Sequence, residues 1–121
     1  MASSILNDIK KVLGVSEDDT SFDVDIILHI NSVFSTVNQM GIGPDEGFVI
    51  TDSSDNWEDF ETDPILLGFL KSYFYLKVRM LFDPPTTSFL LEAYNKQIAE
   101  FEGRISLQRE WGLNPVDPMT V

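Results

Sequence analysis

The fold is decided by the stretch from Asp63 to Pro85, DPILLGFLKSYFYLKVRMLFDPP. Asp63 suits a helix N-cap, and Pro64 follows at the first helical position, where the missing N–H costs nothing. Asp83-Pro84-Pro85 ends the segment, because proline cannot continue a helix. Apolar residues fall on nearly every side of the segment between them. The pattern predicts a helix over 65–82 that is either central to its domain or shared with another subunit.

Two helices are predicted before this stretch. The first runs from about Ser4 to Leu13, and Gly14 suits a left-handed C-terminal cap. An acidic turn over 16–20 leads into the second helix, which we expect to be capped by Asp19 or Ser21 and to end at 40–41. Its predicted buried face consists of Phe22, Ile26, Ile30, Val33, Phe34 and Val37.

A fourth helix is predicted after the prolines, with Thr86, Thr87 or Ser88 as its cap. It is amphipathic, with an apolar face of Phe89, Leu90, Tyr94, Ile98, Phe101 and Ile105. The tail from Trp111 to Val121 holds two prolines and no helical pattern, so we expect it to be extended. The predicted organisation is therefore a helical domain over 1–110 and an extended tail over 111–121.

The segment over 42–62 separates the second and third helices. It contains a glycine- and proline-rich turn, the β-type run from Phe48 to Thr51, and a polar turn at 52–56. Loops this long in small domains are usually functional or contain a small hairpin. The predicted fold class is all-α, a small four-helix bundle-like domain with a long loop or short β-hairpin at 42–62.

Charge and composition exclude several function classes. The 121 residues carry 20 Asp and Glu against 8 Lys and Arg, a net charge of −12 that disfavours ordinary nucleic-acid binding. The 63 N-terminal residues hold fourteen of the carboxylates and only two lysines. No cysteine and a single histidine, His29, argue against thiolate or His-based metal sites and most nucleophilic catalysis. We therefore predict no enzyme, no cofactor, no signal peptide and no membrane span.

The opening SILNDIKKVLG (residues 4–14), with the acidic turn and FDVDIILHIN (residues 22–31), resembles the head-tail connector (adaptor) proteins of long-tailed bacteriophages. Also similar are Gly41-Ile-Gly-Pro44, Phe48-Val-Ile-Thr51 and the helix from Tyr73 to Leu81 that ends in Asp83-Pro84-Pro85. The likeness covers the chain from about Ser4 to Gln108.

The resemblance implies a structural virion protein at the head-tail interface, assembled in the cytoplasm of a host bacterium. Members form a ring, typically dodecameric, between the portal protein and the stopper or tail, and the ring extends the channel for double-stranded DNA. An acidic channel would repel phosphate, so that DNA slides through without specific binding.

Three groups of residues are candidates for these contacts. Tryptophan and methionine are frequent in binding hot spots, so the tail is expected to contact a partner, and the resemblance implies the portal or an adjacent subunit. Its contact residues would be Trp111, Leu113, Pro115, Val116, Pro118 and Met119. The third helix offers subunit-interface candidates: Phe69, Tyr73, Lys77 and Arg79. Its cations have two interpretations that stay open here, pairing with a neighbour's acids or simple extension from an apolar helix. By analogy, an acidic loop would face the channel or the next ring through Asp45, Glu46, Asp52, Asp55, Glu58 and Asp59.

Two other functions stay open at this point. The charge of −12 also fits an acidic inhibitor that mimics DNA and binds a DNA-binding enzyme. The spacing of oxygen ligands from Asp52 to Asp63 loosely resembles a calcium loop, but Trp57 stands where such a loop needs glycine. Solvated carboxylates are the simpler interpretation of that segment.

Overall fold

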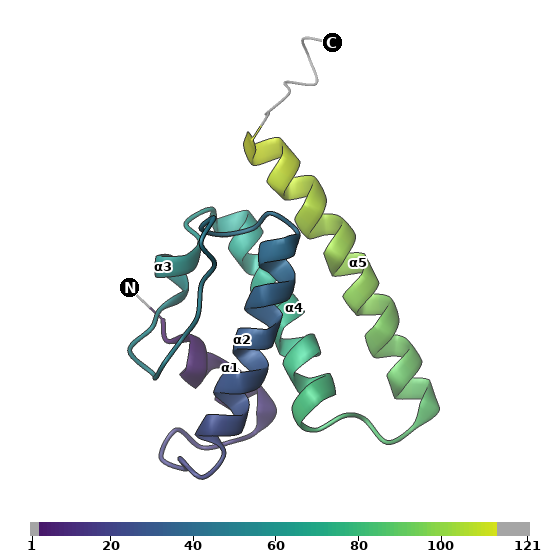
Figure 1. The fold of residues 1–121 in the computed structure, drawn as a ribbon. Coiled ribbons are helices and arrows are strands. Elements are labelled where there is room, and N and C mark those ends of the chain that lie inside the picture. The colour runs from purple at the N-terminus through teal and green to yellow at the C-terminus, as the bar shows by residue number, and fades with distance from the viewer. Residues whose placement is uncertain (1–2, 114–121) are drawn as a thin grey trace.

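The computed structural model describes residues 3–113, which form an all-α domain (Figure 1). This fold class is the one predicted. Within the described residues the helices are α1 (Ile5–Leu13), α2 (Asp23–Gln39), α3 (Trp57–Phe60), α4 (Pro64–Phe82) and α5 (Ser88–Leu113).

Helix α4 lies at the centre of the domain. It packs against α5 on one side and against α2 and α1 on the other (Figure 1). Buried residues occur along most of its length: Leu66, Leu67, Leu70, Tyr73, Phe74, Leu76 and Val78. Of the two explanations for a helix that is apolar on all sides, a central position within its own domain is therefore the main one.

The caps of α1 and α4 are those the sequence predicts. The Ser4 hydroxyl accepts a hydrogen bond from the Asn7 N–H at 3.2 Å, and Gly14 ends α1 in the left-handed conformation with φ +79°. Asp63 Oδ1 accepts from the Ile65 N–H at 3.0 Å, with Pro64 as the first residue of α4.

The predicted start of α2 is wrong. Phe22 occupies the N-cap position without a side-chain hydrogen bond, because Asp19 instead closes its own turn by accepting from the Ser21 N–H. Phe22 is 43% exposed, and its ring packs edge-on against Phe82. The rest of the predicted face of α2 is buried: Ile26, Ile30, Val33, Phe34 and Val37.

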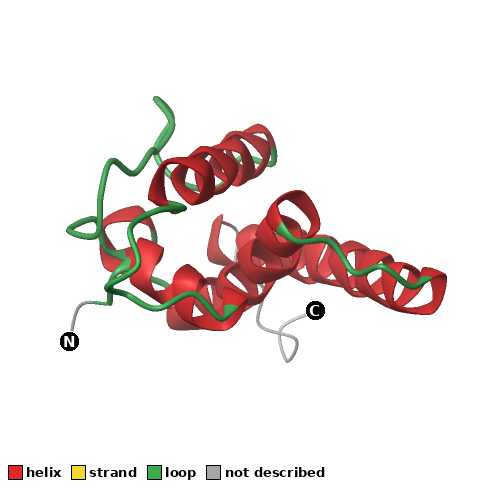
Figure 2. Cartoon of the chain, turned by 90° about the horizontal axis from the view of Figure 1, so that it is seen from below, coloured by secondary structure: helices red, strands yellow, loops and turns green. Residues whose placement is uncertain are grey.

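The segment over 42–62 is an ordered loop that ends in the short helix α3, and it contains no hairpin. Within residues 3–113 no strand forms, and Ser4 and Asn56 make one isolated antiparallel bridge (Figure 2). The run from Phe48 to Thr51 finds a side chain in place of a partner strand. Asn31 donates to the Ile50 carbonyl at 3.1 Å and accepts from the Ile50 N–H at 2.8 Å.

Helix α5 begins after Thr87, whose hydroxyl accepts from the Leu90 N–H, so one of the three predicted caps is confirmed. Its C-terminal end differs from the prediction, because 111–113 are helical rather than extended. Gly112 alone does not stop a helix whose preceding turns are packed, and the next proline in the chain is Pro115. The remainder of the predicted tail, 114–121, lies outside the described residues.

Candidate assembly surfaces

The acidic loop, residues 42–62, is anchored in the core by four buried side chains: Ile42, Ile50, Trp57 and Phe60. The Phe60 ring lies 4.7 Å from the ring of Phe34, between ring centroids, and Phe34 in turn contacts Phe74 of α4. Aromatic packing of this kind fixes the loop against α2 and α4. The loop is therefore a built surface of the domain, and its carboxylates are held in place on it.

Most of the acidic-loop candidates hold the loop together. Asp55 accepts from the Thr51 N–H at 2.7 Å, and Asp59 accepts from the Asn56 N–H in a capping box at the start of α3. Asp52 accepts from Ser54, and those hydrogen bonds hold the pKa of its carboxyl below the ordinary value.

The Glu58 carboxylate also accepts hydrogen bonds from backbone N–H groups, its own and that of Ser3, and these lower the pKa of its carboxyl. Asp45 and Glu46 differ, since both are exposed and neither side chain makes a hydrogen bond among the described residues. The loop thus presents carboxylates at its surface, and those at 45 and 46 make none of the hydrogen bonds that hold it together.

In the segment from Asp52 to Asp63, whose spacing loosely resembles a calcium loop, the carboxylate oxygens accept hydrogen bonds from the protein's own backbone. Asp52 and Asp55 accept from backbone N–H groups, and Asp63 caps α4. Within residues 3–113, no three His, Cys, Asp or Glu side chains are arranged to hold a metal ion.

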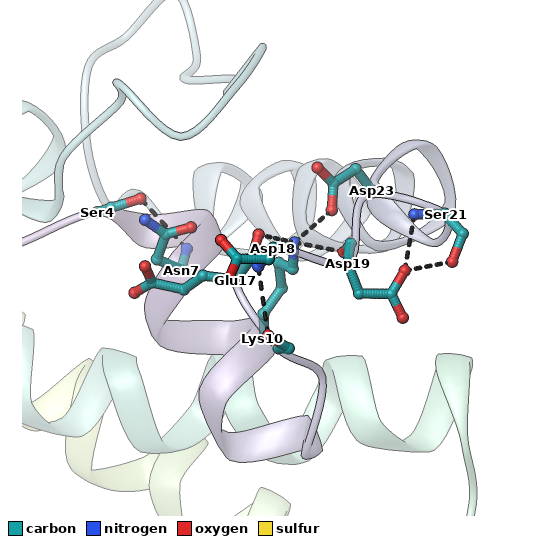
Figure 3. A network of polar contacts seen from close by, with 9 residues as sticks. Ser4, Asn7, Lys10, Glu17, Asp18, Asp19, Ser21 and Asp23 are labelled. Atoms are coloured by element: carbon teal, nitrogen blue, oxygen red, sulfur yellow. Dashed lines mark hydrogen bonds and ion pairs between the residues drawn. The ribbon is translucent and has the colours of Figure 1, made fainter.

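A buried lysine that the sequence did not reveal organises the other acidic segment. Lys10 of α1 is 1% exposed. Its Nζ donates to the carbonyls of Glu17 and Asp19 and forms an ion pair with Asp23 Oδ1 at 2.8 Å (Figure 3). One ammonium thus ties the acidic turn and the first turn of α2 to α1. The available signal is its spacing, because Lys10 lies four residues after the buried Leu6 and so on the same face of α1.

The interface candidates on α4 are mostly used within the chain. Tyr73 is fully buried and donates to Glu102 Oε2 at 2.8 Å, so it is not a surface residue and that prediction is wrong. Burial and the Glu102 carboxylate raise the pKa of the Tyr73 phenol. Lys77 lies over the Tyr73 ring, and Arg79 lies over the Tyr94 ring. Cations that pack on rings of their own chain fit the simpler interpretation, in which they extend from an apolar helix.

Phe69, the fourth of these candidates, belongs to a surface of another kind. We call Ile65, Phe69, Leu107 and Trp111 the α4–α5 apolar patch. These residues, with Arg104 and Gln108, line an open hollow of about 150 Å³. Ile65, Leu107 and Trp111 are each more than half exposed, at 58%, 54% and 58%. Three large apolar side chains in one exposed hollow are typical of a contact surface.

Two contacts hold the C-terminal half of α5, and with it the patch, against the domain. Gln108 Nε2 donates to Asp63 Oδ2 at 3.1 Å, and Arg109 Nε donates to the Gly41 carbonyl at 3.0 Å. The position of Trp111 is therefore set by the fold. Leu113 is the last residue of α5, and Pro115, Val116, Pro118 and Met119 lie outside the described residues.

Almost the whole described chain is similar to one known protein family. Residues 5–112 match the family model described as phage connector protein. This chain belongs to the phage connector protein family. No curated protein and no solved structure gives a significant match. The family match confirms the resemblance that the sequence pattern indicated, and it extends from the first residue of α1 to the last turn of α5.

As a phage connector protein, the chain is a structural component of the virion. The family is one of structural proteins that associate with other head and tail proteins, and it is not a family of enzymes. Within residues 3–113, no helix combines the length and hydropathy that a membrane span requires. A protein that associates with other head and tail proteins needs contact surfaces. The two candidates are the exposed α4–α5 apolar patch and the acidic loop.

Proposed function

We propose that this connector forms a ring between the portal and the stopper or tail and extends the DNA channel across the head-tail interface. Membership of the phage connector family carries the proposal. The surface supports it, because a domain of this size buries its core and still exposes large apolar side chains. Such exposure marks surfaces that other proteins cover. The ring is expected to have about twelve subunits and to assemble in the host cytoplasm before joining the virion.

The distribution of charge supports passage of DNA without binding. Exposed carboxylates in the acidic loop and the acidic turn greatly outnumber nearby cations, and the buried Lys10 is withdrawn from the surface. A channel lined by such a surface would repel the phosphates of double-stranded DNA. We propose that Asp45 and Glu46 face the channel or the next ring, because the fold itself makes no use of them.

The α4–α5 apolar patch is the proposed contact with the portal or an adjacent subunit. Trp111 is exposed on a helix that Arg109 fixes in place, so little conformational entropy is lost when a partner covers it. The tail that follows, with Pro115, Val116, Pro118 and Met119, would add to this contact from the same end of α5.

Light scattering of the purified protein, alone and mixed with the portal protein of the same phage, tests the proposal. We expect a ring-sized mass in at least one sample. A persistent monomer of 13.7 kDa that ignores the portal would overturn the proposal. Salt-sensitive binding of that monomer to a basic DNA-binding enzyme would then favour the DNA-mimic alternative.

A further inference from the structure

A hollow between α1 and α4, distinct from the α4–α5 apolar patch, has the character of a binding site. We call it the α1–α4 hollow; it measures about 290 Å³ and lies over the indole of Trp57. Ile9 and Val12 of α1 and Tyr75 of α4 form further walls. Val12 is 44% exposed, whereas Trp57 is 1% exposed, so the hollow has an accessible rim and a rigid base.

Two lysines line the same hollow. Lys11 is exposed on α1, and Lys71 of α4 places its ammonium 5.7 Å from the centre of the Trp57 ring. Neither forms an ion pair with a carboxylate in the part of the chain that the structure describes. Two carboxylates lie nearby. Asp8 also lines the hollow and accepts from the Trp57 indole at 2.9 Å, and Glu58, on which the Lys71 charge acts, accepts from the Ser3 N–H. The hollow thus offers two ammonium groups that form no ion pair within residues 3–113, beside the Trp57 indole and the Asp8 carboxylate.

The acidic loop carries the complementary feature on a different part of the surface. Val49 is 63% exposed, in the loop between Glu46 and Asp52, which are also exposed. The next residue, Ile50, is held in place, because Asn31 bonds both of its backbone groups and its side chain is only 2% exposed. Val49 therefore stays at the surface beside an anchored residue. A fixed apolar side chain is therefore presented between carboxylates.

We propose that Val49 of one copy enters the α1–α4 hollow of a second copy, with the Asp52 carboxylate that follows it in the loop meeting Lys11 and Lys71. The proposal rests on the ring proposed above and identifies one of its contacts. Copies that each carry a charge of −12 repel one another, so an acidic surface can approach a second copy only where unpaired cations gather. The two surfaces share no residue, and a contact between different surfaces is of the head-to-tail type, which generates a ring when the rotation between copies closes.

Disulfide trapping tests this contact cleanly, because the natural chain contains no cysteine. The variants Val12→Cys and Val49→Cys are purified separately and then mixed, so any bond between the two positions joins different copies. The mixture is oxidised under the conditions in which the wild-type chain assembles, with portal protein present if it is needed. Val24→Cys replaces Val49→Cys in the control, because Val24 is 81% exposed but lies on α2.

We expect the mixture of Val12→Cys and Val49→Cys to form the disulfide-linked dimer at least tenfold faster than the control mixture and faster than either variant alone. Equal rates in a preparation whose wild-type chain forms rings would overturn this contact and leave the ring intact. A wild-type chain that neither assembles nor joins the portal would overturn the ring and the contact together.

Charge reversal gives a second measurement. The double variant Lys11→Glu/Lys71→Glu is expected to need at least a tenfold higher concentration for assembly, while Lys96→Glu on α5 assembles normally. Circular dichroism melting checks that the double variant is folded. If the folded double variant assembles at the wild-type concentration, the proposed role of these lysines is refuted.

Discussion

Replacing Lys10 by methionine tests the most unusual feature of the fold. The substitution keeps an unbranched apolar stem in a side chain that is 1% exposed, and it removes an ammonium with three acceptors. Removing one partner of a buried ion pair typically costs about 3–5 kcal/mol. Asp23 is 24% exposed and lies at the first turn of α2, where the helix dipole favours its charge. We therefore expect the lower end of this range, about 3 kcal/mol.

The free energy of unfolding is measured by urea denaturation, at concentrations where the chain is monomeric. A loss of about 3 kcal/mol corresponds to a fall in Tm of about 10 °C for a domain of this size. Lys96→Met is the control, because Lys96 is exposed on α5, and its effect should stay within about 0.5 kcal/mol. In a double-mutant cycle with Asp23→Asn, Lys10 and Asp23 should show coupling. A Lys10→Met variant as stable as its control would refute the role assigned to this lysine.

Three further predictions address the cap, the loop and the patch. Asp63→Ala should cost at least about 1 kcal/mol at pH 7, because it removes an N-cap and the acceptor of the Gln108 hydrogen bond. The Gln108 hydrogen bond, with those from the first turn of α4, lowers the pKa of Asp63 in the folded chain, so this cost should shrink as the pH falls below 3.8 in urea titrations. Gly41→Ala should lower the free energy of unfolding by about 1–2 kcal/mol, because φ is +83° and a Cβ would lie 2.6 Å from the Arg109 guanidinium. Gly103→Ala, where the helix surface is open, should raise it, and urea denaturation of both variants shows whether the two changes have opposite signs. Trp111→Ala should leave stability within about 0.5 kcal/mol yet weaken attachment to portal rings at least tenfold in a binding assay, and unchanged attachment would contradict the role of the patch.

The sequence predicted the helices well because their boundaries depend on local chemistry. Asp63 and Pro64 start α4 and Ser4 starts α1, as their capping preferences require. The all-round apolar pattern of α4 also indicated a central helix, but it did not tell a neighbour in the same chain from one in another subunit. That distinction depends on how α5 folds back across α4, which is set by contacts such as Tyr73 with Glu102.

The features that the sequence did not predict share a physical cause, which is a contact with a residue distant in the chain. The β-type run at 48–51 left a long loop and a short hairpin both open, and the loop forms because the Asn31 side chain takes the hydrogen bonds that a second strand would have made. Trp111 was expected in an extended tail, but the anchoring of Arg109 on Gly41 favours one more helical turn. The burial of Lys10 does not follow from the sequence, because a lysine is rarely buried and its acceptors lie seven to thirteen residues away.

The separation between structural and unused carboxylates makes the charge of this connector informative about its role. At the start of α2, the buried Lys10 forms an ion pair with Asp23. In the acidic loop, Asp55 and Asp59 accept hydrogen bonds from backbone N–H groups. Asp45 and Glu46 stand outside both arrangements. Carboxylates that no folding interaction uses still add self-repulsion between copies, which opposes assembly. Their presence fits the proposal that they face the DNA channel, where a polyanion is to be repelled, or the next ring.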